Sequence, residues 1–252
     1  MQELKGQRMS NNKTQFGFTE IDENEKTEKV KGVFNSVSSN YDLMNDLMSF
    51  GLHRLWKKSF IESASLKDNA KILDIAAGTA DLSLAFAKKN KTYSIFHTDI
   101  NSNMLEEGRK KLFNHGVILP SVACDCEALP FSDNYFDCVT IGFGLRNMTK
   151  KETALKEVYR VLSPGGKLLI LEFSKVWKPL EKIYDIFSFK IIPRLGEIIS
   201  KDKKSYQYLV ESIRVHPNQE ELKKIMEKTG FFNVSYNNLN AGIAAIHKGY
   251  KV

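Results

Sequence analysis

The stretch from Lys71 to Leu171 alternates short apolar runs with helical patterns, and this alternation constrains the fold more than any other feature of the chain. Short apolar runs bounded by turns predict buried strands. Strands that alternate with helices form a parallel sheet with helices on both faces, so the sequence predicts a doubly wound α/β core. The expected strands are Lys71–Ile75, Tyr93–His97, Ile118–Ala123, Cys138–Gly142 and Gly166–Glu172, and the expected helices are one that ends at Ala87, Ser102–Phe113 and Lys151–Val161.

The remaining segments are expected to add helices and a last pair of strands to one domain that spans residues 25–252. Residues 1–24 are polar and predict a flexible arm. Helical patterns occur at Glu25–Phe34, Tyr41–Ser65 and Gln219–Thr229, and strand patterns at Phe231–Leu239 and Gly242–Tyr250. The expected parts of the domain are N-terminal helices (25–69), a cofactor-binding core (70–175), a helical insertion or lid (176–215) and a C-terminal helix and hairpin (216–252).

Composition excludes several classes of protein. The 252 residues contain no run of 18 or more apolar residues, so no transmembrane helix is expected. The N-terminus lacks the apolar segment of a signal peptide, and three cysteines are too few for a disulfide framework. No spacing of cysteines and histidines fits a metal site. We therefore expect a cytoplasmic protein with reduced thiols and no metal.

The net charge of +7 has three explanations at this stage: nucleic acid, an anionic membrane surface, or ordinary solvated helix faces. The basic residues do not form one stripe, and no basic groove with interleaved aromatic residues is evident, which disfavours nucleic acid. They occur as short pairs along the chain: Lys57-Lys58, Lys88-Lys89, Lys110-Lys111, Lys150-Lys151, Lys203-Lys204 and Lys223-Lys224.

A nucleotide-type ligand is indicated at the carboxyl ends of the first strands, where open parallel sheets bind ligands. The first strand ends in the small-residue turn from Asp74 to Asp81, where the backbone can approach a ligand closely. Asp99 follows the second strand, 21 residues after Gly78, where an acid can accept hydrogen bonds from both ribose hydroxyls. Asp125 and Cys126 follow the third strand and are placed to meet an adenine edge.

The turn lacks the dinucleotide fingerprint G-x-G-x-x-G and the lysine of a phosphate-binding loop. Its order, together with Asp125–Phe131 and the loop Leu162–Leu168, resembles class I S-adenosylmethionine-dependent methyltransferases. The resemblance implies S-adenosylmethionine as cofactor and a Rossmann-like, seven-stranded, mostly parallel sheet that ends in an antiparallel hairpin. The residues expected to bind the cofactor are Asp74, Ala76, Gly78, Thr79, Asp99, Asp125, Cys126 and Gly142.

Segments outside the cofactor half are similar to one family, the ubiquinone/menaquinone biosynthesis C-methyltransferases of the UbiE/MenG type. These segments are Tyr41–Lys57, Gly142–Met148, Leu171–Ser174 with 206–214, and Ala241–Lys251, and the resemblance runs from about residue 15 to the end. The family usually has glycine where this chain has Ala77 and Ala80. If either position needs a positive φ, alanine costs on the order of 1 kcal/mol. Asp125 stands where asparagine is common.

The resemblance implies methylation of a ring carbon on a polyprenyl benzoquinol, a demethylmenaquinol, or both. A phenolate makes that carbon nucleophilic, so the phenol needs a base or a cation that stabilises its anion. We assign Arg146 to the phenolate and Asn147 to orientation of the ring hydroxyl, and His53 and Tyr41 to proton transfer. The alternative roles are a surface ion pair for Arg146, and capping or packing for His53 and Tyr41.

The insertion is rich in large apolar residues flanked by Lys190, Arg194, Lys201, Lys203 and Lys204. It is either ordinary core or a lid that covers the prenyl tail and touches the inner face of the cytoplasmic membrane. A homodimer or a quinone-biosynthesis complex is a further expectation. Another small-molecule methyltransferase and a non-catalytic scaffold stay open as alternatives. The sequence leaves open the ring type, the tail length, the general base, the oligomeric state and the start codon (Met1 or Met9).

Overall fold

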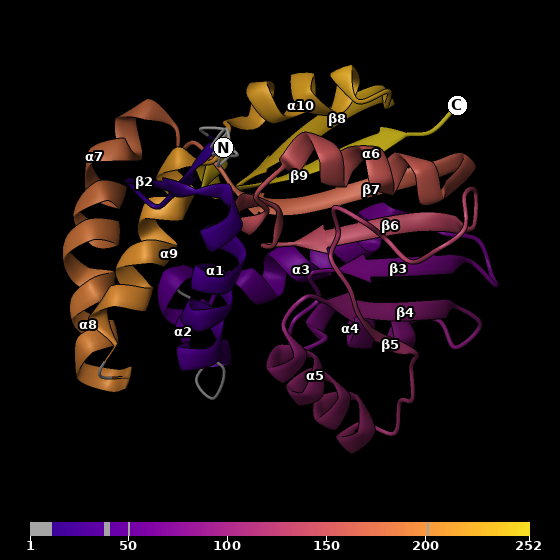
Figure 1. The fold of residues 1–252 in the computed structure, drawn as a ribbon, viewed down its shortest axis with the longest axis horizontal. Coiled ribbons are helices and arrows are strands. Elements are labelled where there is room, and N and C mark those ends of the chain that lie inside the picture. Colours follow the sequence, from indigo (N-terminus) through magenta and orange to yellow (C-terminus); the bar gives the residue numbers. More distant parts are fainter. Residues whose placement is uncertain (1–11, 38–40, 50, 201) are drawn as a thin grey trace, which may run out of the picture.

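The computed structural model describes residues 12–37, 41–49, 51–200 and 202–252, apart from the side chains of Tyr41, Asp42, Leu47, Ile199 and Ser200. A seven-stranded sheet with the order β5-β4-β3-β6-β7-β9-β8 forms its centre (Figure 1). The strands are β3 (Lys71–Ile75), β4 (Ser94–Asp99), β5 (Ser121–Ala123), β6 (Phe136–Gly142), β7 (Leu162–Phe173), β8 (Phe232–Leu239) and β9 (Ala244–Tyr250).

The five strands from β3 to β7 are parallel, and β9 pairs antiparallel with both β7 and β8. This confirms the expected α/β class and its antiparallel C-terminal hairpin. The helices that follow the strands are α4 (Asp81–Lys89), α5 (Ser102–Asn114), α6 (Lys151–Val161) and α10 (Gln219–Lys228), and α3 (His53–Ala64) precedes the sheet. β5 is shorter than the expected strand from Ile118 to Ala123.

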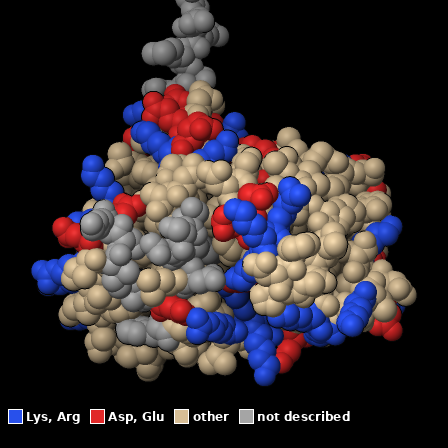
Figure 2. All heavy atoms as spheres, turned by 90° about the horizontal axis from the view of Figure 1, so that it is seen from below, with Lys and Arg blue, Asp and Glu red and all other residues tan. Residues whose placement is uncertain are grey.

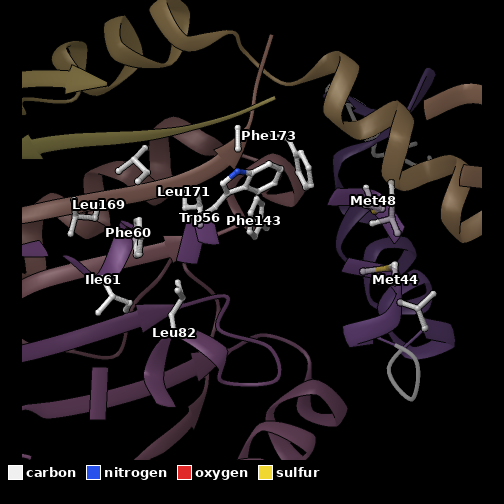
Figure 3. Packing of buried hydrophobic residues seen from close by; sticks show 14 of the residues in the cluster. Met44, Met48, Trp56, Phe60, Ile61, Leu82, Phe143, Leu169, Leu171 and Phe173 are labelled. Atoms are coloured by element: carbon white, nitrogen blue, oxygen red, sulfur yellow. The ribbon is translucent and has the colours of Figure 1, made fainter. Parts of the chain in front are cut away.

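Two buried clusters lie on opposite faces of the sheet, because alternate residues of each strand point to opposite sides. Ile72 belongs to the cluster with α3 and α4, while its neighbour Leu73 belongs to the cluster with α6 and α10. In the first cluster, the ring of Trp56 lies 6.3 Å from that of Phe143 and 5.9 Å from that of Phe173 (Figure 3). This aromatic group ties α3 to the ends of β6 and β7, next to the cofactor half.

A layer of helices stands beyond the carboxyl ends of the parallel strands (Figure 1). It contains α1 (Glu23–Val37), α2 (Tyr41–Ser49), and the insertion, which consists of α7 (Lys178–Ile186), a π-helical turn (Phe187–Ile191), α8 (Ile192–Ser200) and α9 (Lys203–Val215). α8 packs on α9 and α2, and α9 packs on α1. Residues 178–200 and 203–215 are thus helical. None of the helices in the described ranges is long and apolar enough to span a membrane.

The N-terminal segment differs from the expected flexible arm. Residues Lys13–Phe16 and Thr19–Asp22 form an antiparallel hairpin, β1–β2, directly before α1. Phe16 stacks on Tyr208 with ring centres 4.2 Å apart, and the Phe18 N–H donates to Glu211 Oε2 at 3.1 Å. Contacts with α9 thus order this polar segment, and the boundary at residue 24 was wrong for residues 13–22. Residues 1–11 of the expected arm lie outside the described residues.

Candidate active site

The turn after β3 has the unusual backbone that close approach to a ligand requires. Ala76, Gly78 and Ala80 have φ values of 50°, 52° and 65°. A Cβ on Gly78 would lie 3.2 Å from Met104 Cε, so a larger residue would press on α5. Ala80 has the left-handed conformation and is fully buried, whereas Ala77 does not have a positive φ. Of the two family glycine positions, only the one at Ala80 carries backbone strain.

Asp99 is fixed at the end of β4 by backbone donors from two segments. Its Oδ2 accepts from the Gly78 N–H at 2.9 Å, and its Oδ1 accepts from the Asn101 N–H at 2.8 Å. Burial raises the pKa of Asp99, and these two donors act in the opposite direction. Each carboxylate oxygen can accept more than one hydrogen bond. Asp99 can therefore hold the loop and still accept from a ligand hydroxyl.

A cavity opens between this loop and α1, with about 790 Å³ of empty space counting the part open to solvent. Five of the eight expected cofactor residues line it: Ala76, Gly78, Asp99, Asp125 and Cys126. Asp74 and Gly142 line a smaller neighbouring cavity, which shares Ala76 and Phe143 with the first. Thr79 is buried and lines neither.

Asp74 has a role beneath the loop. Its two carboxylate oxygens accept from Ser83 Oγ at 2.6 Å and from Thr140 Oγ1 at 2.8 Å, so it joins β3, α4 and β6. Burial raises the pKa of Asp74 to about 6, and the hydroxyl donors oppose this shift. Asp74 therefore supports the turn through its bonds to α4 and β6. The turn residues Ala76 and Gly78 line the larger of the two cavities.

Several lining residues were not among the expected ones. Thr27, Val30 and Phe34 extend over the cavity from α1, and Met104 reaches it from α5. The helical pattern from Glu25 to Phe34 predicted that α1 forms but carried no signal for what its apolar face covers. Here this face covers the larger cavity, which we call the cofactor cavity.

Arg146 and Asn147 lie in a short 3₁₀ turn, Leu145–Asn147, and face different surroundings. Asn147 lines the cofactor cavity, and its Oδ1 accepts from the Tyr208 hydroxyl at 3.1 Å. Arg146 is buried; its Nη1 lies 2.9 Å from Glu172 Oε1 and also donates to the Phe143 carbonyl. The ion pair is therefore an interior one. Arg146 lines a separate cavity under the β1–β2 hairpin, together with Lys26, Lys151 and Tyr208.

Of the two proton-transfer candidates, His53 is not among the residues that line the cofactor cavity. His53 Nε2 lies 2.8 Å from Asp46 Oδ1, and burial followed by the charge of Lys57 lowers the pKa of His53. Its ring lies at a basic hollow between α3 and α4. Tyr41 is the first residue of α2, and its side chain lies outside the described part. No cluster of metal-ligand residues occurs within the described ranges.

Comparison with known proteins identifies the family. The family model of the ubiE/COQ5 methyltransferase family matches residues 22–251. The chain belongs to this family. It is 59% identical over 240 residues to the ubiquinone/menaquinone biosynthesis C-methyltransferase UbiE of Paraburkholderia phytofirmans, covering 95% of this chain and 99% of that one. The same enzyme of Burkholderia mallei is 58% identical over the same lengths. The expected family and enzyme class are confirmed.

Solved structures show the same fold at low sequence identity. A SAM-dependent methyltransferase from Aquifex aeolicus has a TM-score of 0.56 at 16% identity and covers 78% of this chain and 89% of its own. The phosphoethanolamine N-methyltransferase 2 of Haemonchus contortus, in complex with S-adenosyl-L-methionine, has a TM-score of 0.58 at 16% identity, over 78% of this chain and 52% of its own. The cyclase SpnF, with a TM-score of 0.61 at 17% identity over 78% and 80%, shares the fold as well. The fold alone therefore does not define the reaction.

Proposed function

We propose that this protein transfers the methyl group of S-adenosylmethionine to a ring carbon of a polyprenyl quinol in ubiquinone or menaquinone biosynthesis. The observation that carries the proposal is the cavity at the carboxyl ends of the strands. There Asp99 is held by Gly78 and faces the same space as Asp125 and Asn147. Membership of the ubiE/COQ5 methyltransferase family supports the methyl-transfer chemistry.

The lining residues suggest how the cofactor lies. Asp99 accepts from the ribose hydroxyls, since its backbone donors leave lone pairs for them. Asp125 and Cys126 would hold the adenine, and Met104, which lines the same cavity, would contact its ring. The Ala76–Gly78 turn would hold the amino-acid part. Burial raises the pKa of Cys126 well above its ordinary value, so this cysteine stays a neutral thiol that packs rather than reacts.

The quinol ring binds at Asn147, which lies between the cofactor cavity and the cavity under the hairpin. Tyr208 fixes the Asn147 amide by donating to its oxygen, and this leaves the amide N–H groups to orient the ring hydroxyl. Arg146 and Lys151 both line the cavity under the hairpin. Because Glu172 compensates the charge of Arg146, Lys151 supplies the positive charge on the side where a phenolate would form. Positioning then supplies much of the rate, because methyl transfer is an in-line displacement.

The prenyl tail follows the helical insertion. Ile183 and Ile198 are 68% and 76% exposed on α7 and α8, and Ile186 and Ile191 lie between them with about half of each side chain exposed. Such an apolar row suits a peripheral contact with the membrane that holds the substrate. Of the flanking lysines, Lys203 pairs with Glu197 at 3.3 Å, and Lys201 lies outside the described residues. Flotation with lipid vesicles tests this contact: charge reversal at Lys201, Lys203 and Lys204 should weaken it, and unchanged flotation would refute it.

The reaction itself is tested with purified protein, S-adenosylmethionine carrying an isotope-labelled methyl group, and reduced demethylated quinols. We expect the label on a ring carbon of a benzoquinol, a naphthoquinol or both, as located by mass spectrometry and NMR. Label on a hydroxyl oxygen would instead establish an O-methyltransferase. A protein that binds no cofactor at millimolar concentration would favour a scaffold role.

A further inference from the structure

A strongly basic hollow lies between α3 and α4 and is bordered by α5, and it shares no lining residue with the cofactor cavity. It has about 1200 Å³ of empty space counting the part open to solvent. Its lining contains six lysine and arginine residues and two carboxylates, an excess of four positive charges in a chain whose total is +7. The basic residues are Arg54, Lys57, Lys58, Lys88, Lys89 and Lys111, and the acids are Glu62 and Asp81.

The helix periodicity explains why these charges gather. Positions 54, 57, 58, 61 and 62 form one stripe of α3, and positions 81, 85, 88 and 89 form one stripe of α4. The two helices pack against each other, so the stripes face a common groove. Figure 2 shows Lys and Arg gathered near the lower edge of its face, on the side where α3 and α4 lie behind the sheet in Figure 1.

The floor and the rim of the hollow differ in how far their charges are compensated. On the floor, Asp81 pairs with both Lys57 and Lys111. The charges of these two lysines hold the pKa of Asp81 at about 2, although burial acts in the opposite direction. On the rim, Lys58 and Lys88 are exposed and form no ion pair with a described residue. The uncompensated charge therefore faces solvent.

We propose that this basic hollow docks the protein on the phosphate headgroups of an anionic membrane surface. Charge complementarity favours this partner. Leu55 does not line the hollow, but it is 61% exposed on α3, one helical turn from Lys58, and offers an apolar side chain to the same surface. The described residues that line the hollow include no Phe, Tyr or Trp, and the ring of His53 is held by Asp46, whereas a single-stranded nucleic acid would need several free rings for base stacking. The helix dipole of α4 accounts for Lys88 and Lys89 at its last turn but not for Lys58 on α3.

This docking rests on the proposed function in one respect: a polyprenyl tail keeps the substrate in the bilayer, so the protein must work at the membrane surface. It predicts a second contact, independent of the apolar row on α7 and α8. Because surface attraction is screened beyond about 10 Å at 0.1 M salt, this contact should be sensitive to ionic strength. The contact on α7 and α8, which combines lysines with exposed apolar side chains, should be less sensitive to ionic strength.

The test is co-flotation of the full-length protein with phosphatidylcholine vesicles that contain or lack phosphatidylglycerol. The variant is Lys58→Glu/Lys88→Glu, since neither residue lines the cofactor cavity or pairs with Asp81. Its matched control is Lys156→Glu/Lys224→Glu, which makes the same change in charge on α6 and α10, at the opposite face of the sheet. Calorimetry with S-adenosylmethionine checks that both variants keep a folded cofactor site.

We expect more protein to float with the anionic vesicles than with the neutral ones. This difference should disappear on raising the salt, and it should be reduced at least about fivefold for each charge removed in the hollow. The α6/α10 control should float like the natural protein. Equal flotation of the two double variants, or equal binding to neutral vesicles, would overturn the docking site. Methyl transfer to a short-chain, water-soluble quinol should be unchanged in Lys58→Glu/Lys88→Glu. That readout separates a failure of docking from a failure of the proposed reaction.

Discussion

Arg146 Nη1 lies 2.9 Å from Glu172 Oε1, and both side chains are almost completely buried. Glu172 also accepts from the Arg146 backbone N–H through its second oxygen at 3.2 Å. The carboxylate therefore holds both the charge and the main chain of the turn that presents Asn147. At the ring site proposed above, Arg146 would therefore act partly as a positioning residue, through the shape of this turn.

Removal of one partner should be more harmful than removal of both. We expect Glu172→Gln to lower the free energy of unfolding by about 3 kcal/mol, because it leaves a buried guanidinium uncompensated. Arg146→Met/Glu172→Leu should recover most of that loss, and urea denaturation measures both. If Glu172→Gln does not fold, the double variant still tests the point. An unfolding midpoint for Glu172→Gln equal to that of the natural protein would contradict a tightly coupled pair.

Asp99 should dominate cofactor affinity. In Asp99→Asn the amide N–H₂ would face either the Gly78 or the Asn101 N–H, since both carboxylate oxygens accept from the backbone. Loss of charge-assisted hydrogen bonds worth about 1.5–3 kcal/mol should weaken S-adenosylmethionine binding roughly 10- to 100-fold in calorimetry. Glu107→Gln is the control, because Glu107 is exposed on α5 and pairs with Lys110. Equal affinity of Asp99→Asn and the natural protein would remove Asp99 from the site.

Ala77 and Ala80, the two family glycine positions of the turn, should respond differently to glycine. Ala80 has a φ of 65°, so Ala80→Gly relieves backbone strain. This relief offsets two losses of stability: the contacts of the buried methyl group, and the larger conformational entropy that glycine gives the unfolded chain. Ala77 has no such strain, and Ala77→Gly should cost about 1 kcal/mol. Thermal unfolding should therefore separate the two variants by about 1 kcal/mol, with Ala77→Gly the less stable. A larger loss for Ala80→Gly than for Ala77→Gly would contradict this explanation.

His216 should make the protein less stable in mild acid. Burial, followed by the charges of Lys151, Arg146 and His247, lowers the pKa of His216 well below its ordinary 6.5. A base whose folded-state pKa is lowered stays neutral in the folded state, so stability is lost as pH falls below 6.5, by up to about 1.4 kcal/mol per pH unit.

The matching variant is His216→Leu, which removes this proton. Urea unfolding between pH 7 and 5.5 should show a shallower loss of stability for His216→Leu than for the natural protein. Asp74 acts in the opposite sense: its pKa is raised to about 6, so its contribution decreases stability as pH rises from about 3.8 to 6. Comparing the two proteins cancels that contribution. Parallel pH profiles would show that His216 does not titrate on unfolding.

Most of the sheet could be predicted because its signals are local. The apolar run Lys71–Ile75 and the helix Lys151–Val161 have the expected bounds in the structure. The β1–β2 hairpin could not be predicted in this way. Its residues are polar, and its order depends on Tyr208 and Glu211, which lie more than 190 residues further along the chain.

The candidate site was likewise predictable only where its geometry follows from the strand order. Gly78 and Asp99 meet because the carboxyl ends of adjacent parallel strands share one edge, which follows from topology. The burial of Arg146 against Glu172 depends on the pairing of β6 with β7 and on the path of the turn after β6. The sequence alone therefore does not distinguish a surface ion pair from an interior one. The α1 residues over the cavity depend likewise on a tertiary contact, that of α1 with α5.

The most direct test of the central claim is mass spectrometry of the quinones extracted from cells that lack this protein. We predict accumulation of a benzoquinone or naphthoquinone precursor one methyl group short, at the expense of the mature quinone. The natural gene should restore the mature quinone, and a gene carrying Asp99→Asn should restore much less of it. A mutant whose quinones are fully methylated, with no such precursor, would contradict the proposed C-methylation.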